Sequence, residues 1–119
     1  MSETKEEFIQ KLLFKTKDLT LRSIKVFQAL PKTEEAKIIG RQFLRSSSSV
    51  GANYRAVCRA RSKAEYYSKL SITLEEADET MFWLEIIIES GLLPKNKLST
   101  ILDEYEEIVK ILSKARKNT

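Results

Sequence analysis

Histidine is absent from the 119 residues, and cysteine occurs once, at Cys58. Without imidazole the chain lacks the commonest general base and the commonest transition-metal ligand. A di-iron bundle needs Glu-x-x-His on two helices, and a structural zinc site needs several thiolate or imidazole ligands, so both classes are excluded. Carboxylates on an exposed helix face are a weak ligand set for a divalent metal. We therefore predict that the protein is not an enzyme and binds no metal and no cofactor.

Glycine and proline are scarce, with three and two residues. Sheet proteins need a turn about every eight to twelve residues, so this scarcity favours a few long helices. No stretch approaches the roughly 18 apolar residues of a membrane span. The opening MSETKEEF is polar and acidic, unlike a signal peptide. A single thiol allows no internal disulfide. We expect a soluble, cytoplasmic protein with no membrane contact.

The apolar pattern divides the chain into four segments, approximately 4–30, 34–60, 63–90 and 94–116. The first stops before Pro31, the second follows the N-cap residue Thr33, the third follows Ser62, and the fourth begins near Pro94. Helices joined by such short connections lie antiparallel to their neighbours. The sequence predicts an all-α protein, an antiparallel up-and-down four-helix bundle formed by residues 1–119 as one domain.

The run Ser46-Ser47-Ser48-Ser49-Val50-Gly51 has the composition of a linker. The apolar residues around it nevertheless share one face, within about 60°, only if a helix passes through the serines unbroken. These residues are Ile39, Phe43, Val50, Tyr54 and Val57. We therefore interpret the serine run as helical.

Two segments carry apolar residues on more than one face. The third has a seam with alternating spacings of three and four, formed by Tyr67, Leu70, Leu74, Ala77, Met81, Leu84 and Ile88. A second stripe lies behind it, formed by Ile72, Trp83, Ile86 and Ile87. The first segment places Phe14 and Leu21 opposite its core stripe, to which Phe8 belongs. Either these residues fill a broad core, or they form an oligomer interface, which is the interpretation we favour.

Between Glu35 and Glu65 there is no acid but there are seven bases, Lys37, Arg41, Arg45, Arg55, Arg59, Arg61 and Lys63. Five of them, from Lys37 to Arg59, share one stripe about 80° wide opposite the apolar face, with the small residues Ser48 and Ala52 between them. Such a stripe suits a phosphate backbone. Two alternatives stay open: a solvated surface, or pairing with the third segment, which has six acids and no base from Ser71 to Pro94.

The remaining candidates are more consistent with packing than with chemistry. Phe43, Tyr54, Tyr67 and Tyr105 lie in core stripes, so we do not expect them to stack on bases. Cys58 lies on a flank of small residues, and we expect a buried small side chain there rather than a reactive thiol.

The segment Arg45-Ser46-Ser47-Ser48-Ser49-Val50-Gly51-Ala52-Asn53-Tyr54-Arg55 resembles the R-S-x-S-x-x-x-N-x-x-E signature of four-helix bundle proteins encoded by intervening sequences in bacterial 23S rRNA genes, with Asn53 one residue later than in that signature. The stretches 62–66, 70–80 and 83–85 are similar to the third helix of that family. The resemblance implies a homopentameric ring. Through the related accessory proteins of diversity-generating retroelements, it also implies RNA and a reverse transcriptase as partners, with Arg41, Arg45, Arg55 and Arg59 as RNA contacts. This chain has Tyr54-Arg55-Ala56-Val57 where many relatives carry an acid.

Taken together, these features predict an oligomeric module that binds nucleic acid, RNA preferred, through the basic stripe. The alternative is a structural or adaptor homo-oligomer whose basic and acidic helices pair with each other.

Overall fold

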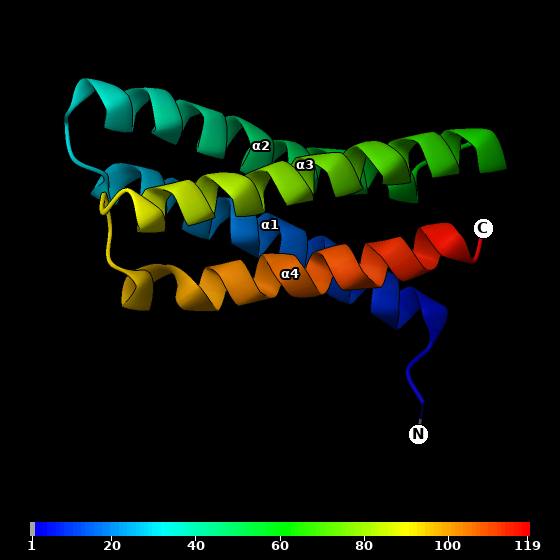
Figure 1. The fold of residues 1–119 in the computed structure, drawn as a ribbon. Helices are drawn as coiled ribbons and strands as arrows, with labels where there is room; N and C mark the ends of the chain where they lie inside the picture. Colours follow the sequence, from blue (N-terminus) through cyan, green and yellow to red (C-terminus); the bar gives the residue numbers. More distant parts are fainter. Residues whose placement is uncertain (1) are drawn as a thin grey trace.

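The computed structural model describes residues 2–119 and contains four helices, α1 (Lys5–Ala29), α2 (Glu34–Cys58), α3 (Lys63–Glu89) and α4 (Lys95–Lys117). Consecutive helices run in opposite directions, so both termini lie at the same end of the bundle (Figure 1). The predicted fold class, an antiparallel all-α four-helix bundle, is confirmed. Each helix begins and ends within two residues of the expected range. None of the helices in residues 2–119 is long and apolar enough to cross a membrane.

Residues that can cap a helix stand at most of the helix ends. Thr4, Thr33 and Ser62 are the N-caps of α1, α2 and α3, and each hydroxyl accepts a hydrogen bond from a backbone N–H in the first turn. Pro94 precedes α4 and gives no side-chain cap. After α3, Gly91 adopts a φ of +77°, the left-handed conformation that turns the chain toward α4.

The serine run lies inside α2, which passes through it without a break. Ser46 and Ser47 are fully buried, and their hydroxyls donate to the carbonyl oxygens of Phe43 and Leu44 at 3.0 and 3.1 Å. Ser46 also hydrogen-bonds across the interface to the Thr80 hydroxyl of α3, at 2.9 Å. Because both serines are small and their hydroxyls are satisfied, α2 can be buried at this point without an orphaned polar group.

The other side of the serine run packs against α1. The Thr20 hydroxyl donates to the backbone carbonyl of Ser47 at 3.2 Å. A Cβ placed on Gly51 would lie 3.0 Å from that hydroxyl oxygen and 3.4 Å from the carbonyl oxygen of Thr16. Glycine at position 51 therefore permits a close approach of α1 and α2 that a larger residue would obstruct.

The helices α1 and α4 make the sparsest contact of the four neighbouring pairs, and this contact includes two groups of polar side chains. Ser23 and Tyr105 are both fully buried, and their hydroxyls lie 3.0 Å apart. Lys15 and Arg22 of α1 both pair with the Glu104 carboxylate of α4, each at 2.5 Å. The Arg22 hydrogen bond, followed by that from Lys15, lowers the pKa of Glu104 to about 2 despite its partial burial.

The core face of α3 is rotated from the predicted seam. Thr73, Thr80 and Ile87 are fully buried. Tyr67, which was expected in the core, is 50% exposed, and Ile88 is only half-buried. The seam was placed by counting apolar residues alone. Thr73 and Thr80 belong to the buried face because their hydroxyls bond to the carbonyl oxygens one turn earlier, at Lys69 and Glu76.

We predict that acid weakens the bundle through Glu104. A carboxyl group with a folded-state pKa below its ordinary value of 4.5 stabilises the fold above that value, and this stabilisation is lost as pH falls toward 2. Glu104→Gln should lower the free energy of unfolding at pH 7 by about 1–2 kcal/mol, because Lys15 and Arg22 are partly solvated and their attraction is screened. Between pH 5 and pH 3 the variant should lose less stability than the wild type.

Denaturant unfolding at both pH values measures this effect. Glu106→Gln, on the exposed face of the same helix, is the matched control and should change stability by no more than about 0.5 kcal/mol. Equal pH dependence in the wild type and Glu104→Gln would contradict the assignment.

Candidate nucleic-acid interface

The seven predicted cations lie along α2 and the connection that follows it. Lys37, Arg41, Arg45 and Arg55 are residues of α2, Arg59 is its C-cap residue, Arg61 lies in the connection, and Lys63 begins α3. All seven are exposed. Between Arg45 and Arg55, the outer face of α2 carries the small exposed residues Ser48 and Ala52.

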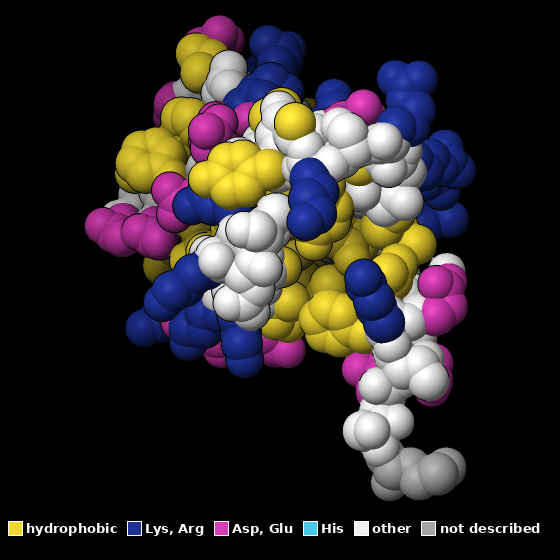
Figure 2. Space-filling model, turned by 90° about the vertical axis from the view of Figure 1, so that its right-hand side faces the viewer, with side chains coloured by type: hydrophobic (Ala, Val, Ile, Leu, Met, Phe, Trp, Pro, Cys, Tyr) yellow, Lys and Arg dark blue, Asp and Glu magenta, His cyan; other side chains and the backbone are white. Residues whose placement is uncertain are grey.

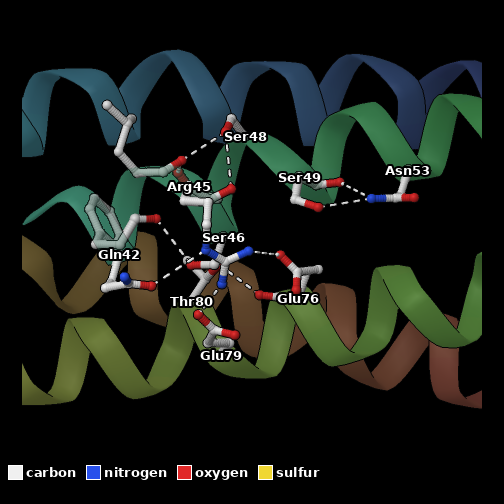
Figure 3. A network of polar contacts seen from close by, with 12 residues as sticks. Gln42, Arg45, Ser46, Ser48, Ser49, Asn53, Glu76, Glu79 and Thr80 are labelled. Atoms are coloured by element: carbon white, nitrogen blue, oxygen red, sulfur yellow. Dashed lines mark hydrogen bonds and ion pairs between the residues drawn. The ribbon is translucent and has the colours of Figure 1, made fainter. Parts of the chain in front are cut away.

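Arg45 forms ion pairs within the chain. Its guanidinium extends from α2 to α3, where it pairs with Glu76 at 3.0 Å and with Glu79 (Figure 3). Glu79 also accepts a hydrogen bond from the Trp83 indole N–H at 3.1 Å. The Trp83 and Arg45 contacts together lower the pKa of Glu79. Pairing between basic α2 and acidic α3, one of the alternatives left open by the sequence, thus occurs at this arginine.

The other six cations make at most one further ion pair within residues 2–119. Arg61 has a loose contact with Glu65, 3.7 Å long and four residues further along the chain. Five cations make no ion pair with an acid anywhere in residues 2–119. They are Lys37, Arg41, Arg55, Arg59 and Lys63. The structure thus separates one arginine that joins two helices from five exposed positive charges that have no acidic partner in the described part of the chain.

A shallow groove of about 610 Å³ runs beside the cationic stripe, between α1 and α2. Phe14 and Leu21 of α1 line it and are 73% and 54% exposed, in agreement with their expected position outside the core. Arg55 and Arg59 line the opposite side. The apolar ridge of α1 and the cationic stripe of α2 are therefore neighbouring surfaces of the molecule.

The apolar surface expected on α3 is only partly present. Ile72 is 36% exposed, while Trp83 and Ile86 are half-buried. The placement of Ile87 on this surface was wrong, because Ile87 is fully buried in the core. Its place is taken by Phe82, which is 50% exposed and packs edge-to-face against Trp83, with ring centroids 4.9 Å apart. Phe82 lies only 40° from Ile86 on a helical wheel, so the same periodicity identifies it.

The expected burial of Cys58 was also wrong, since its side chain is exposed at the end of α2. It lines the α1–α2 groove. The described residues 2–119 contain no group of three or more His, Cys, Asp or Glu side chains able to hold a metal ion.

The fold and this surface define a class of protein: a small four-helix bundle with a serine-rich, tightly packed second helix that is cationic on its outer face. The chain belongs to the 23S rRNA-intervening sequence protein family, whose model matches residues 4–114. It is similar to the crystal structure of a protein with unknown function from the S23 ribosomal protein family from Bacteroides thetaiotaomicron. The two are 31% identical with a TM-score of 0.82, over 88% of this chain and 97% of the other. No curated protein matches the chain.

Proposed function

We propose that this protein is a non-catalytic, oligomeric module that binds RNA through the outer face of α2. The observation that carries the proposal is the set of five exposed cations without an acidic partner in residues 2–119. Exposed like charges along one helix repel one another, and a polyanion relieves that repulsion. The family to which the chain belongs is named for an intervening sequence of 23S rRNA, which favours RNA as the polyanion.

The chemistry of the surface favours contacts to phosphate over readout of bases. Arg41, Arg55 and Arg59 carry planar guanidinium groups that bind phosphate oxygens in pairs. The stripe is a convex helix face on which small residues separate the cations, so it presents neither a stacking platform nor a set of amides aimed at base edges. Binding should therefore depend on charge and shape, with little sequence specificity.

We predict that Arg41→Glu, Arg55→Glu and Arg59→Glu together weaken RNA binding by more than about 100-fold at 0.1 M salt, because three phosphate contacts become repulsive. The triple reversal changes the net charge from +4 to −2. Fluorescence anisotropy with a labelled 20-nucleotide RNA hairpin measures the affinity, and circular dichroism checks that helicity is unchanged.

The matched control reverses Lys25, Lys95 and Lys97, which are exposed and belong to α1 and α4. It gives the same net charge and should retain most of the affinity. If the control loses as much as the triple variant, overall charge rather than the stripe governs binding. RNA binding by the triple variant at wild-type strength would refute the proposed site.

The self-association in this proposal rests on two apolar ridges. One comprises Phe14 and Leu21 on α1, and the other comprises Ile72, Phe82, Trp83 and Ile86 on α3. The helices α1 and α3 do not pack against each other, so they occupy diagonal corners of the bundle and their ridges face roughly opposite ways. A contact between the α1 ridge of one protomer and the α3 ridge of the next is therefore heterologous, and repetition of it can close a ring.

Charge supports the same pairing. The α1 ridge is flanked by the exposed Lys17 of the same helix. Glu75 and Glu85 are exposed on α3, near its ridge. Joining the two ridges brings opposite charges together while the middle of the α2 stripe stays open to RNA. A homopentameric ring is the assembly that the family resemblance implies.

We predict that Leu21→Asp and Phe82→Asp each reduce the wild-type oligomer to monomers in sedimentation velocity, because each places a charge in one of the two apolar ridges. Ile38→Asp is the control, since Ile38 is exactly as exposed as Leu21, at 54%, but lies on α2. The control should sediment as the wild type does.

Mixing the two monomeric variants tests the pairing of unlike ridges. One intact α1 ridge and one intact α3 ridge remain in the mixture, so a 1:1 heterodimer should form. A mixture that stays monomeric would contradict the heterologous contact. A wild-type protein that sediments as a monomer at 50 µM would refute self-association, and a loss of assembly in the arginine triple variant would favour the adaptor alternative.

A further inference from the structure

A second groove, of about 810 Å³, opens between the first half of α1 and the last half of α4. These two helices make the sparsest contact of the neighbouring pairs, and their polar clamp at Glu104 lies toward the middle of the bundle. Toward the termini, no ion pair joins the described residues of α1 and α4. The groove therefore lies at the end of the bundle that carries both chain ends (Figure 1).

The floor of this groove is apolar. Leu12 and Ile108 are buried beneath it, Ile111 is half-buried, and Phe8 is 40% exposed. The sequence pattern placed Phe8 in the core stripe of α1. Its exposure follows from the loose contact between α1 and α4 at this end. Figure 2 looks onto the same end and shows apolar side chains at its centre, beside the N-terminal segment.

The rim of the groove is acidic, in contrast to the cationic face of α2. Its acids are Glu3, Glu6, Glu7 and Glu107. Of the two lysines on the rim, Lys11 pairs with Glu3 and Lys15 pairs with Glu104. Glu6, Glu7 and Glu107 form no ion pair with any base in residues 2–119. An apolar floor thus lies beside three carboxylates that form no ion pair within the described residues.

We propose that this groove binds a basic amphipathic helix of a partner protein. Apolar side chains spaced three and four residues apart would occupy the floor beside Phe8, and flanking Lys or Arg side chains would meet the carboxylates of Glu6, Glu7 and Glu107. The acidic rim disfavours RNA as the occupant. It also disfavours the α3 ridge of a second copy, because that ridge lies beside Glu75 and Glu85. This site is separate from the α2 stripe, and its test contains no RNA.

The probe is a fluorescein-labelled 18-residue peptide of leucine and lysine in a helical amphipathic pattern. A peptide with glutamate in place of every lysine is its counterpart. We expect the wild-type protein to bind the lysine peptide at least about 10-fold more tightly than the glutamate peptide at 0.1 M salt. Higher salt should reduce this difference.

Two variants locate the binding. Combining Glu6→Gln, Glu7→Gln and Glu107→Gln should weaken binding of the lysine peptide about 10-fold. Glu7 also accepts a hydrogen bond from the Thr4 backbone N–H at 3.3 Å, and glutamine at position 7 can preserve this cap. The control for this triple variant combines Glu75→Gln, Asp78→Asn and Glu85→Gln. It removes the same number of negative charges from exposed positions of α3. Phe8→Ala should weaken binding about 5- to 20-fold through lost apolar contact, while Phe82→Ala on α3 should not.

Several results would overturn the proposal. The control variants on α3 could weaken binding of the lysine peptide as much as the groove variants do. The lysine and glutamate peptides could also bind equally well. Loss of the wild-type oligomer in Phe8→Ala without peptide would show that a second copy occupies the groove. Loss of RNA binding in the arginine triple variant has no bearing on this site, so the two proposals fail independently.

Discussion

The bundle depends on the burial of a serine-rich stretch of helix between two neighbours. Ser46 and Ser47 have no exposed surface, and small side chains at these positions and at Gly51 allow α1 and α3 to approach the backbone of α2. Serine in a helix interior normally favours other conformations, yet here each hydroxyl bonds to a carbonyl one turn earlier. The polar groups are therefore satisfied inside the helix, and the cross-helix bond to Thr80 sets how α2 and α3 meet.

This packing orients the charges of α2. With the serines turned inward, Arg45 lies at the edge facing α3 and pairs with its acids, whereas Arg41 and Arg55 face outward. The arginine and serines that resemble the family signature are therefore mainly structural residues. Of the cations available to a polyanion, Arg55 lies within the segment 45–55, whereas Lys37, Arg41, Arg59 and Lys63 lie outside it. The segment that resembles the family signature and the surface proposed to bind RNA thus share few residues, Ser48 and Arg55 among them.

The sequence was sufficient to predict the helices and the continuity of α2, because the apolar residues on both sides of the serines share one face only in an unbroken helix. The sequence was insufficient to predict which face of α3 is buried. Thr73 and Thr80 lie on that face, and a pattern that considers only apolar residues leaves them out. The exposure of Tyr67 and Cys58 depends on where neighbouring helices end, which periodicity does not encode. The Arg45 ion pairs depend on how α2 and α3 are rotated about their axes, and charge composition alone left that alternative open.

The most direct test of whether α2 has a packing face and a binding face compares two single variants, Ser46→Leu and Ser48→Leu. Ser46 is fully buried, whereas Ser48 is exposed among the cations. Ser46→Leu should lower the free energy of unfolding by about 2–3 kcal/mol through overpacking and lost hydrogen bonds. Ser48→Leu should change it by less than about 1 kcal/mol and weaken RNA binding by obstructing the stripe. Equal effects of the two substitutions on stability, or a stable Ser46→Leu, would contradict this account.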